Sequence, residues 1–254
     1  MSEIKIIPLG TVSPYCKGDM NCPGYLVKYN EKNILLDCGN GITRLMNFPD
    51  DLFNLSVIIT HYHKDHLGDI GAIQYASYVY RKLLEERGCK VDVYLPKNDV
   101  GYIKKSILCV KESYCNYFDI DDNYSFNVDD LKLTFSNNKS HTIKSYVVKL
   151  ENDDFKIVYT SDVGTSNFSE LVDFCKDSDL LICESSFLRK HYSNSTVHMR
   201  AYDAGVLAKE SNSKKLLLTH FWPDEDKKLY LAEAMEVFEN TDAAEEGKCL
   251  VLRR

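Results

Sequence analysis

Residues 55–66 read Leu-Ser-Val-Ile-Ile-Thr-His-Tyr-His-Lys-Asp-His, and this stretch says most about the fold. Its first half, residues 55–60, is a short apolar run that predicts a buried strand. Its second half places four side chains that can bind a metal ion within six residues: His61, His63, Asp65 and His66. Imidazole and carboxylate groups are common ligands of zinc and other divalent ions. The stretch therefore predicts a metal site in the loop that leaves this strand.

Three further polar residues follow other predicted strands. His141, Asp162 and His220 each come after an apolar, strand-like segment, at Leu131–Ser136, Lys156–Thr160 and Lys215–Thr219 respectively. Taken singly, each is better explained as a capping or surface residue. As a set they matter more, because loops at the ends of buried strands are where sheet proteins carry their functional groups.

Apolar periodicity predicts alternating strands and helices along the whole chain. The other expected strands are Ile4–Leu9, Tyr25–Tyr29, Asn33–Asp37, Val91–Leu95, Tyr146–Leu150, Leu180–Glu184 and Cys249–Leu252. The expected helices are Ile70–Arg87, Val100–Cys109, Phe168–Cys175, Met199–Glu210 and Lys228–Glu239. Strands followed by helices in each half of the chain favour an α+β fold of two packed sheets with helices outside. No linker-like segment divides the chain, so we expect a single domain over residues 1–254.

Composition limits the class of protein. The 254 residues are 44% hydrophobic and 27% charged, which is typical of a globular protein, and the net charge of −7 argues against a broad basic surface for nucleic acid. Nine cysteines without regular spacing indicate reduced thiols and a cytoplasmic location. No apolar run reaches the roughly 18 residues of a membrane-spanning helix, so we expect no membrane association.

The motif His61-x-His63-x-Asp65-His66, followed by His141, Asp162 and His220, resembles the metal-binding motifs of the metallo-β-lactamase-fold hydrolases. The resemblance implies an αββα sandwich, with two mixed sheets packed face to face and a site for two divalent metal ions between them. One ion would be held by His61, His63 and His141, and the other by Asp65, His66 and His220. Asp162 would bridge them together with a water or hydroxide. Zinc is the expected metal, and manganese or iron would also suit these ligands.

A second motif narrows the branch of this family. Residues 181–187, Leu-Ile-Cys-Glu-Ser-Ser-Phe, are similar to a strand-end motif of the transfer-RNA 3′-processing nucleases (ribonuclease Z) and related phosphodiesterases. In those relatives a histidine matching His198, oriented by a carboxylate such as Glu184, serves the leaving oxygen or the phosphate. We therefore expect Asp65, Glu184 and His198 to be the catalytic residues. The alternatives are a strand-end surface carboxylate and a helix-start histidine.

The chain departs from ribonuclease Z in one respect. Those enzymes carry a long arm that grips transfer RNA between the motifs matched by His141 and Asp162, and the predicted strands Tyr146–Leu150 and Lys156–Thr160 leave no room for it here. The layout looks more like YhfI-like metallohydrolases and compact phosphodiesterases, which are often homodimers. We therefore expect metal-hydroxide attack on a small phosphodiester or cyclic nucleotide. The alternatives are a ribonuclease Z-like enzyme that binds RNA, a lactone or thioester hydrolase, and a metal-dependent binding protein without turnover.

Overall fold

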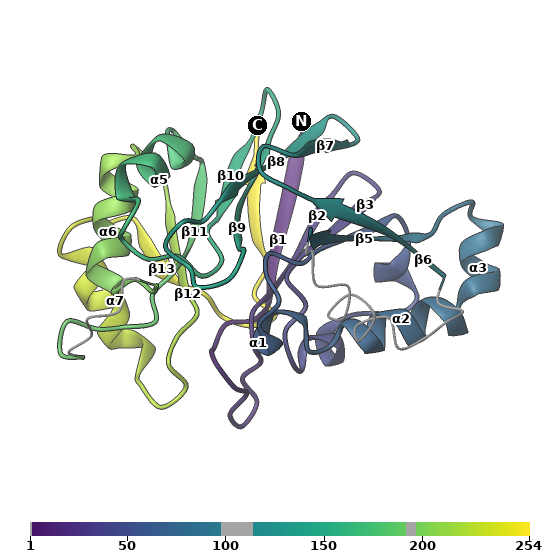
Figure 1. Ribbon diagram of the computed structural model, residues 1–254, viewed down its shortest axis with the longest axis horizontal. Coiled ribbons are helices and arrows are strands. Elements are labelled where there is room, and N and C mark those ends of the chain that lie inside the picture. The colour runs from purple at the N-terminus through teal and green to yellow at the C-terminus, as the bar shows by residue number, and fades with distance from the viewer. Residues whose placement is uncertain (1, 98–113, 192–196) are drawn as a thin grey trace. The chain divides into compact units, whose positions relative to one another are not determined.

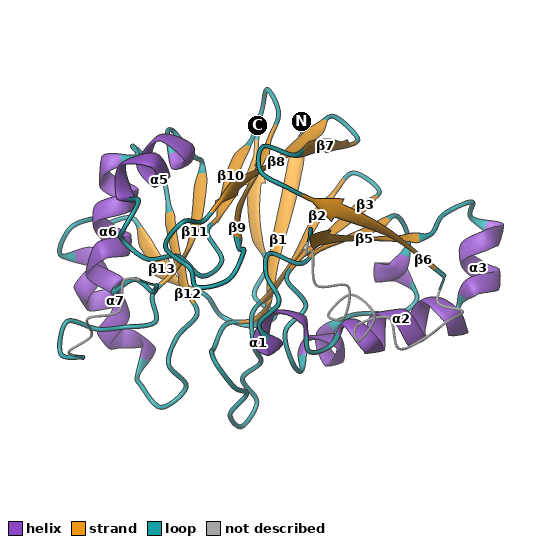
Figure 2. Cartoon of the chain, in the orientation of Figure 1, coloured by secondary structure: helices purple, strands orange, loops and turns teal. Residues whose placement is uncertain are grey.

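The computed structural model describes residues 2–97, 114–191 and 197–254 (Figure 1). The chain forms two compact units. The first unit comprises Met1–Gly10, Tyr15–Ile120 and Glu246–Arg254, and the second comprises Thr11–Pro14 and Asp121–Glu245. Each unit contains one seven-stranded mixed sheet and helices of its own. Figure 2 distinguishes the helices from the strands by colour. The expected single domain over residues 1–254 stays a prediction.

The sheet of the first unit has the strand order β14-β1-β2-β3-β4-β5-β6. The four strands from β14 to β3 pair in antiparallel fashion, and β3 to β6 pair in parallel. The strands are β1 (Glu3–Gly10), β2 (Gly24–Tyr29), β3 (Lys32–Leu36), β4 (Leu55–Ile58), β5 (Val91–Pro96), β6 (Cys115–Ile120) and β14 (Leu250–Arg253). Strand β4 is buried at every position, as expected for a parallel strand covered on both faces.

The helices of the first unit are short. Within the described residues they are the 3₁₀ helices η1 (Ile42–Leu45) and η2 (Asp50–Leu52), and the α-helices α1 (Lys64–Leu67), α2 (Ile70–Val79) and α3 (Arg81–Glu86). The single helix expected over Ile70–Arg87 is therefore wrong in one detail, because the backbone at Tyr80 departs from helical geometry and separates α2 from α3. The helix expected over Val100–Cys109 lies outside the described residues.

The core of the first unit holds the histidine-rich loop in place from both sides. Val57 in β4 lies in one buried apolar cluster with Leu67 at the end of α1 and with Ile70 and Ile73 in α2. Fully burying each such side chain stabilises the fold by about 1.5–3 kcal/mol. The strand before the loop and the helix after it are thus anchored together, which restricts the residues between them.

The sheet of the second unit has the order β13-β12-β11-β10-β9-β8-β7. Its strands β7 to β10 are antiparallel and β10 to β13 are parallel, which repeats the layout of the first sheet. The strands are β7 (Ser125–Val128), β8 (Leu131–Asn137), β9 (Tyr146–Glu151), β10 (Lys156–Tyr159), β11 (Leu180–Glu184), β12 (Leu216–Thr219) and β13 (Thr241–Ala243). Strands followed by helices, which the sequence predicts for each half of the chain, are present in both units.

The described part of the second unit contains three helices: α5 (Phe168–Cys175), α6 (Ala201–Glu210) and α7 (Lys227–Met235). Helix α5 has the expected bounds, whereas α6 begins two residues later than expected because Arg200 and Asp203 form its N-terminal cap. Helix α7 begins at Lys227, where the Asp226 side chain accepts a hydrogen bond from the Lys228 N–H at 2.9 Å. These helices cover the strands whose ends carry the polar residues considered next.

The parallel strands of the second unit place several functional candidates at one edge. Glu184 ends β11, His220 directly follows β12 and Asp162 lies shortly after β10. Because β10, β11 and β12 are parallel neighbours, their carboxyl ends meet at the same edge of the sheet. The topology therefore brings together three residues that are separated by 22 and 36 positions in the sequence.

Two further observations concern the whole described chain. Among these residues, no helix has the length and apolar character needed to cross a membrane. None of the eight cysteines that they include forms a disulfide.

Candidate metal centre

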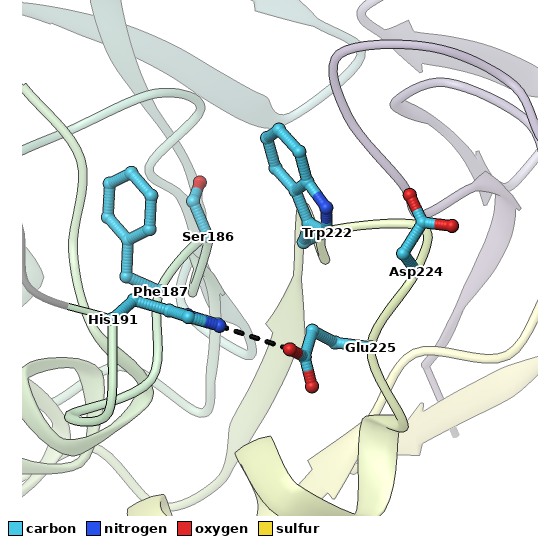
Figure 3. Close-up of a pocket in the computed structure, with 6 residues that line it drawn as sticks. All are labelled: Ser186, Phe187, His191, Trp222, Asp224 and Glu225. Carbon is cyan, nitrogen blue, oxygen red and sulfur yellow. Dashed lines mark hydrogen bonds and ion pairs between the residues drawn. The ribbon is translucent and has the colours of Figure 1, made fainter.

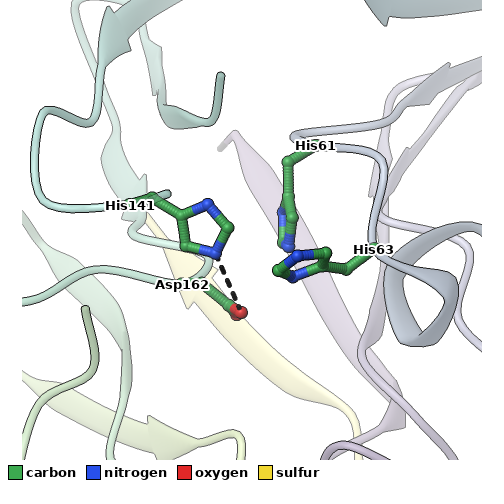
Figure 4. A group of neighbouring side chains, drawn as sticks. All are labelled: His61, His63, His141 and Asp162. Atoms are coloured by element: carbon green, nitrogen blue, oxygen red, sulfur yellow. Dashed lines mark ion pairs between the residues drawn. The ribbon is translucent and has the colours of Figure 1, made fainter. Parts of the chain in front are cut away.

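The first unit gathers its four predicted ligands around one turn of chain. His61 and His66 are buried, and their ring centroids lie 4.1 Å apart. The His63 ring lies 4.8 Å from that of His61, and Figure 4 shows these two side chains leaving the same loop. Asp65 approaches His66, with its Oδ2 atom 3.5 Å from Nε2 of the ring. The expected clustering of the loop residues is thus present within this unit.

A buried carboxylate that the motif did not include supports these histidines. Asp37 has no exposed surface, and its Oδ2 atom lies 2.8 Å from Nδ1 of His66. The backbone N–H and the hydroxyl of Thr60 both donate to Asp37, each at 2.8 Å. The Thr60 hydroxyl also lies 3.1 Å from Nδ1 of His61. Asp37 therefore sets the ring orientation of His66 directly and that of His61 through Thr60.

In the second unit, the Asp162 carboxylate lies between two histidines. Its Oδ1 atom is 2.8 Å from Nε2 of His220, and its Oδ2 atom is 3.9 Å from Nε2 of His141. Figure 4 marks the second of these ion pairs with a dashed line. A carboxylate that presents one oxygen to each of two imidazoles has the geometry of a group shared between two ligand sets.

Glu184 forms hydrogen bonds with several residues next to this cluster. It is fully buried, and its Oε1 atom lies 2.9 Å from Nδ1 of His198 and accepts a 2.6 Å hydrogen bond from the Val163 N–H. Its other oxygen accepts a 2.6 Å hydrogen bond from the Ser186 hydroxyl. The same hydroxyl lies 2.8 Å from Nδ1 of His220. One carboxylate thus positions His198 directly and His220 through Ser186.

Glu184 also changes the acid–base behaviour of His198. Burial disfavours the charged imidazolium and by itself lowers the pKa of His198. The negative charge and the hydrogen bond of Glu184 act in the opposite direction, and on balance the pKa lies above that of an ordinary histidine. His198 consequently keeps its proton to a higher pH, which suits a proton donor.

The backbone next to this cluster adopts an uncommon conformation. His220 and Ser161 have φ angles of 60° and 51°, in the left-handed region that residues other than glycine seldom occupy. Such a residue costs of order 1–3 kcal/mol and persists only where its surroundings hold it. At Asp162, the Asn138 side-chain amide donates to the carbonyl oxygen and supplies part of that support.

The histidines fit a metal site because they share one arrangement. In each of four rings a protein group lies at Nδ1, which makes Nε2 the nitrogen that could bind a metal. The partners at Nδ1 are Thr60 for His61, Asp37 for His66, Ile143 for His141 and Ser186 for His220. Groups that fix ring orientation in this way are typical of metal-ligating histidines. Imidazole and carboxylate ligands together suit zinc, manganese and iron.

Fold and donor chemistry together define a class: a metal-dependent hydrolase of the metallo-β-lactamase fold, with two mixed sheets and helices. Residues 32–221 match the Beta-lactamase superfamily domain, and the chain belongs to this family. The family implies divalent metal ions, and the His/Asp clusters described above carry the groups that bind them. The fold expected from the sequence is confirmed.

The chain is similar to three known proteins, one of them in fold alone. "Probable metallo-hydrolase YhfI" of Bacillus subtilis (strain 168) is 26% identical over 219 residues, covering 85% of this chain and 86% of that protein. The YhfI crystal structure covers 99% of this chain and 100% of its own, with a TM-score of 0.86 and 24% identity. Ribonuclease Z of Archaeoglobus fulgidus is 28% identical over an alignment of 310 positions, gaps included, that covers 95% of this chain and 95% of that protein. A diphosphatase from the PhnP family, at 13% identity, has a TM-score of 0.76 and covers 98% of this chain and 97% of its own.

Proposed function

We propose that this protein is a phosphodiesterase with two metal ions that hydrolyses a small phosphodiester, such as a cyclic nucleotide. The observation that carries the proposal is the buried Glu184–His198 pair, in which Nδ1 of His198 lies 2.9 Å from the carboxylate. Potential ligand atoms of Asp162, His198 and His220 all lie within 4.8 Å of one another. A proton donor beside metal ligands is what the departure of an alkoxide or ribose oxygen requires.

The ligand assignment rests on family membership and on the chemistry of the side chains. We assign His61, His63 and His141 to one ion, Asp65, His66 and His220 to the other, and Asp162 to both. Bound divalent ions would supply charge neutralisation for the phosphodiester and a water acidic enough to act as nucleophile near neutral pH. Zinc is the proposed metal, because zinc takes imidazole and carboxylate ligands readily.

The proton transfers of the reaction are assigned to side chains of the protein. Asp65 accepts a proton from the attacking nucleophile. His198 protonates the leaving oxygen or stabilises the phosphate, and its raised pKa favours the protonated form that either role needs. Glu184 is a positioning residue, since it holds the imidazole of His198 and balances its charge. The partner implied is a small phosphodiester rather than a macromolecule.

Processing of transfer RNA is the second candidate, because ribonuclease Z proteins are among the relatives that match over nearly the whole chain. Two observations favour the smaller substrate. Strands β9 and β10, with the short turn that joins them, fill residues 146–159 of the segment between His141 and Asp162, where a tRNA-gripping arm would have to be inserted. The net charge of −7 also weakens the attraction to an RNA backbone.

The test is a comparison of ester classes on one protein sample whose metal content is measured. Turnover of bis(p-nitrophenyl) phosphate should exceed that of a lactone and a thioester, and cyclic nucleotides and a transfer-RNA precursor would then be compared. Preferential cleavage of the lactone or thioester would overturn the phosphodiesterase assignment. No turnover of any ester at full metal occupancy would favour the metal-dependent binding protein. A homodimer and a cytoplasmic location stay predictions, the first of which light scattering can check.

A further inference from the structure

The second unit contains a pocket whose walls are aromatic. Figure 3 shows Phe187 and Trp222 on opposite sides of its opening, with Ser186 between them. The cavity has a volume of about 250 Å³, and its remaining lining residues are His191, Asp224 and Glu225. Trp222 is 38% exposed, which is unusual for the largest apolar side chain and leaves part of its ring accessible to a ligand.

Hydrogen bonds hold the backbone of both aromatic residues in place. The Phe187 N–H donates to the Met199 carbonyl at 3.1 Å, and the Phe187 carbonyl accepts from the Ala201 N–H at 2.9 Å. The backbone N–H of Trp222 donates to the hydroxyl of the buried Tyr230 at 3.3 Å. The two walls are therefore preformed, and a flat group entering between them would not have to order the chain first.

The pocket adjoins the Glu184–His198 pair. Ser186 lines the pocket and also hydrogen-bonds Glu184 at 2.6 Å. The rings of Phe187 and His198 have centroids 6.0 Å apart, and Trp222 follows the predicted ligand His220 by two residues. A molecule with its phosphate at His198 would therefore have an adjacent group within reach of the aromatic walls.

The charges of the pocket disfavour a second phosphate as its occupant. The six lining residues, all within the described chain, include two carboxylates and no lysine or arginine. Glu225 accepts hydrogen bonds from Lys190 at 2.8 Å and lies 3.1 Å from Nε2 of His191, as the dashed line in Figure 3 marks. An uncharged ring with hydrogen-bond donors on its edge fits such walls, and an anion does not.

We propose that the cleft between Phe187 and Trp222 binds the nucleobase of a nucleotide phosphodiester. Stacking on aromatic side chains is available to every base, while carboxylates select exocyclic amino groups such as that of cytosine. Guanine, adenine and cytosine should therefore bind better than uracil, which presents carbonyl oxygens on both sides of its one ring N–H. That the base belongs to a phosphodiester rests on the proposed function, whereas base binding itself does not.

The chain offers a direct probe of this cleft, because Trp222 is its only tryptophan. Titration of the metal-free, full-length protein with cytidine should quench tryptophan fluorescence in a saturable manner, and uridine should bind several-fold more weakly. Ribose and inorganic phosphate should cause no change. Free N-acetyltryptophanamide, titrated in parallel, corrects for light absorbed by the bases.

Two variants test whether the nucleoside that quenches the fluorescence is bound in this cleft. Phe187→Ala should weaken cytidine binding by about 5- to 100-fold through loss of one stacking surface. Tyr75→Ala is the control, since Tyr75 is a 58% exposed aromatic residue that does not line the pocket, and it should leave cytidine binding unchanged. If Phe187→Ala fails to fold, as circular dichroism would show, Phe187→Leu takes its place, because leucine keeps most of the bulk without a stacking face.

The outcomes separate this inference from the proposed function. Cleavage of bis(p-nitrophenyl) phosphate without saturable quenching by any nucleoside would overturn the base-binding cleft and leave the phosphodiesterase standing. Saturable quenching that depends on Phe187, in a protein that cleaves no phosphodiester, would support the cleft and overturn the function. Equal affinity for uridine and cytidine would contradict the role given to Asp224 and Glu225.

Discussion

His198 Nδ1 lies 2.9 Å from a carboxylate oxygen of Glu184, a residue with no exposed surface. The distance is that of a charge-assisted hydrogen bond, which is roughly twice as strong as one between neutral groups. The imidazole is thus held in one orientation, with Nε2 directed away from Glu184. An activity that needs a proton donor at this position should show its dependence on the pair in two ways, through pH and through the leaving group.

The pH dependence of phosphodiester turnover should report the pKa of His198. Because Glu184 raises this pKa, the protonated form persists to higher pH, and kcat should fall as pH rises through it. Glu184→Gln removes the negative charge, so the pKa of His198 drops and the alkaline limb of the kcat profile should move to lower pH. Lys209→Ala, an exposed residue of α6, should leave the profile in place. An alkaline limb unmoved by Glu184→Gln would show that His198 is not the titrating group.

Asp37 should control metal affinity without touching the metal. Asp37→Asn replaces a charged acceptor of the His66 ring by a neutral amide, and loss of such a supporting group typically lowers metal affinity about 10- to 100-fold. Competition with a chelator of known affinity measures the change.

Asp51 offers a matched control for Asp37. This carboxylate is also buried in the first unit, but it pairs with Lys28 at 2.6 Å and holds no histidine. Asp51→Asn should therefore lower the free energy of unfolding and leave metal affinity close to that of the parent. Equal metal loss in the two variants would mean that Asp37 acts only through general stability.

Ser186 should link the Glu184 carboxylate to the His220 ring. Ser186→Ala removes the hydroxyl that lies 2.8 Å from Nδ1 of His220, so the ring is no longer fixed and metal affinity should fall about tenfold. Ser178→Ala removes another buried hydroxyl of the second unit, bonded to Ser213 at 2.7 Å, and serves as the control. Metal content after dialysis distinguishes the two variants. Equal metal content in both would show that Ser186 does not support the metal site.

Metal removal should abolish turnover and lower thermal stability together. A ligand present at about 1,000 times its Kd stabilises the folded state by about 4 kcal/mol, so the chelated protein should unfold at a lower temperature. Readdition of zinc or manganese should restore both properties. Retention of full phosphodiesterase activity in metal-depleted protein would contradict the assignment of the histidine and aspartate clusters.

The sequence indicated most residues of the candidate site because they follow one physical rule. Asp162, Glu184 and His220 sit at the carboxyl ends of buried strands, and apolar runs identify such strands well. Asp37 ends an equally apolar strand, yet no neighbouring histidine marked it as functional. Its partner His66 lies 29 positions away, and only the parallel pairing of β3 with β4 brings their loops together. Supporting hydrogen bonds of this kind depend on tertiary structure.

The elements that the sequence did not predict lack a distinct pattern of apolar residues. Strand β6 is mostly half-buried or exposed, and β13 has only three residues, so neither shows a clear apolar period. The break between α2 and α3 was missed because Tyr80 continues the helical spacing of apolar residues. The aromatic pocket could not be predicted either, since Phe187 and Trp222 are 35 residues apart and only the fold brings them to one pocket.

The role of His198 as proton donor is tested by measuring how His198→Ala changes the hydrolysis of two phosphodiesters that differ only in their leaving group. On p-nitrophenyl methyl phosphate the leaving group departs readily without a proton, whereas on phenyl methyl phosphate it needs protonation. With metal content equal to the parent, we predict that kcat falls at least tenfold further on the phenyl ester, since general acid catalysis contributes roughly 10²–10⁴-fold. An equal loss on both esters, or a loss that parallels the metal content, would contradict the role of His198 as the proton donor.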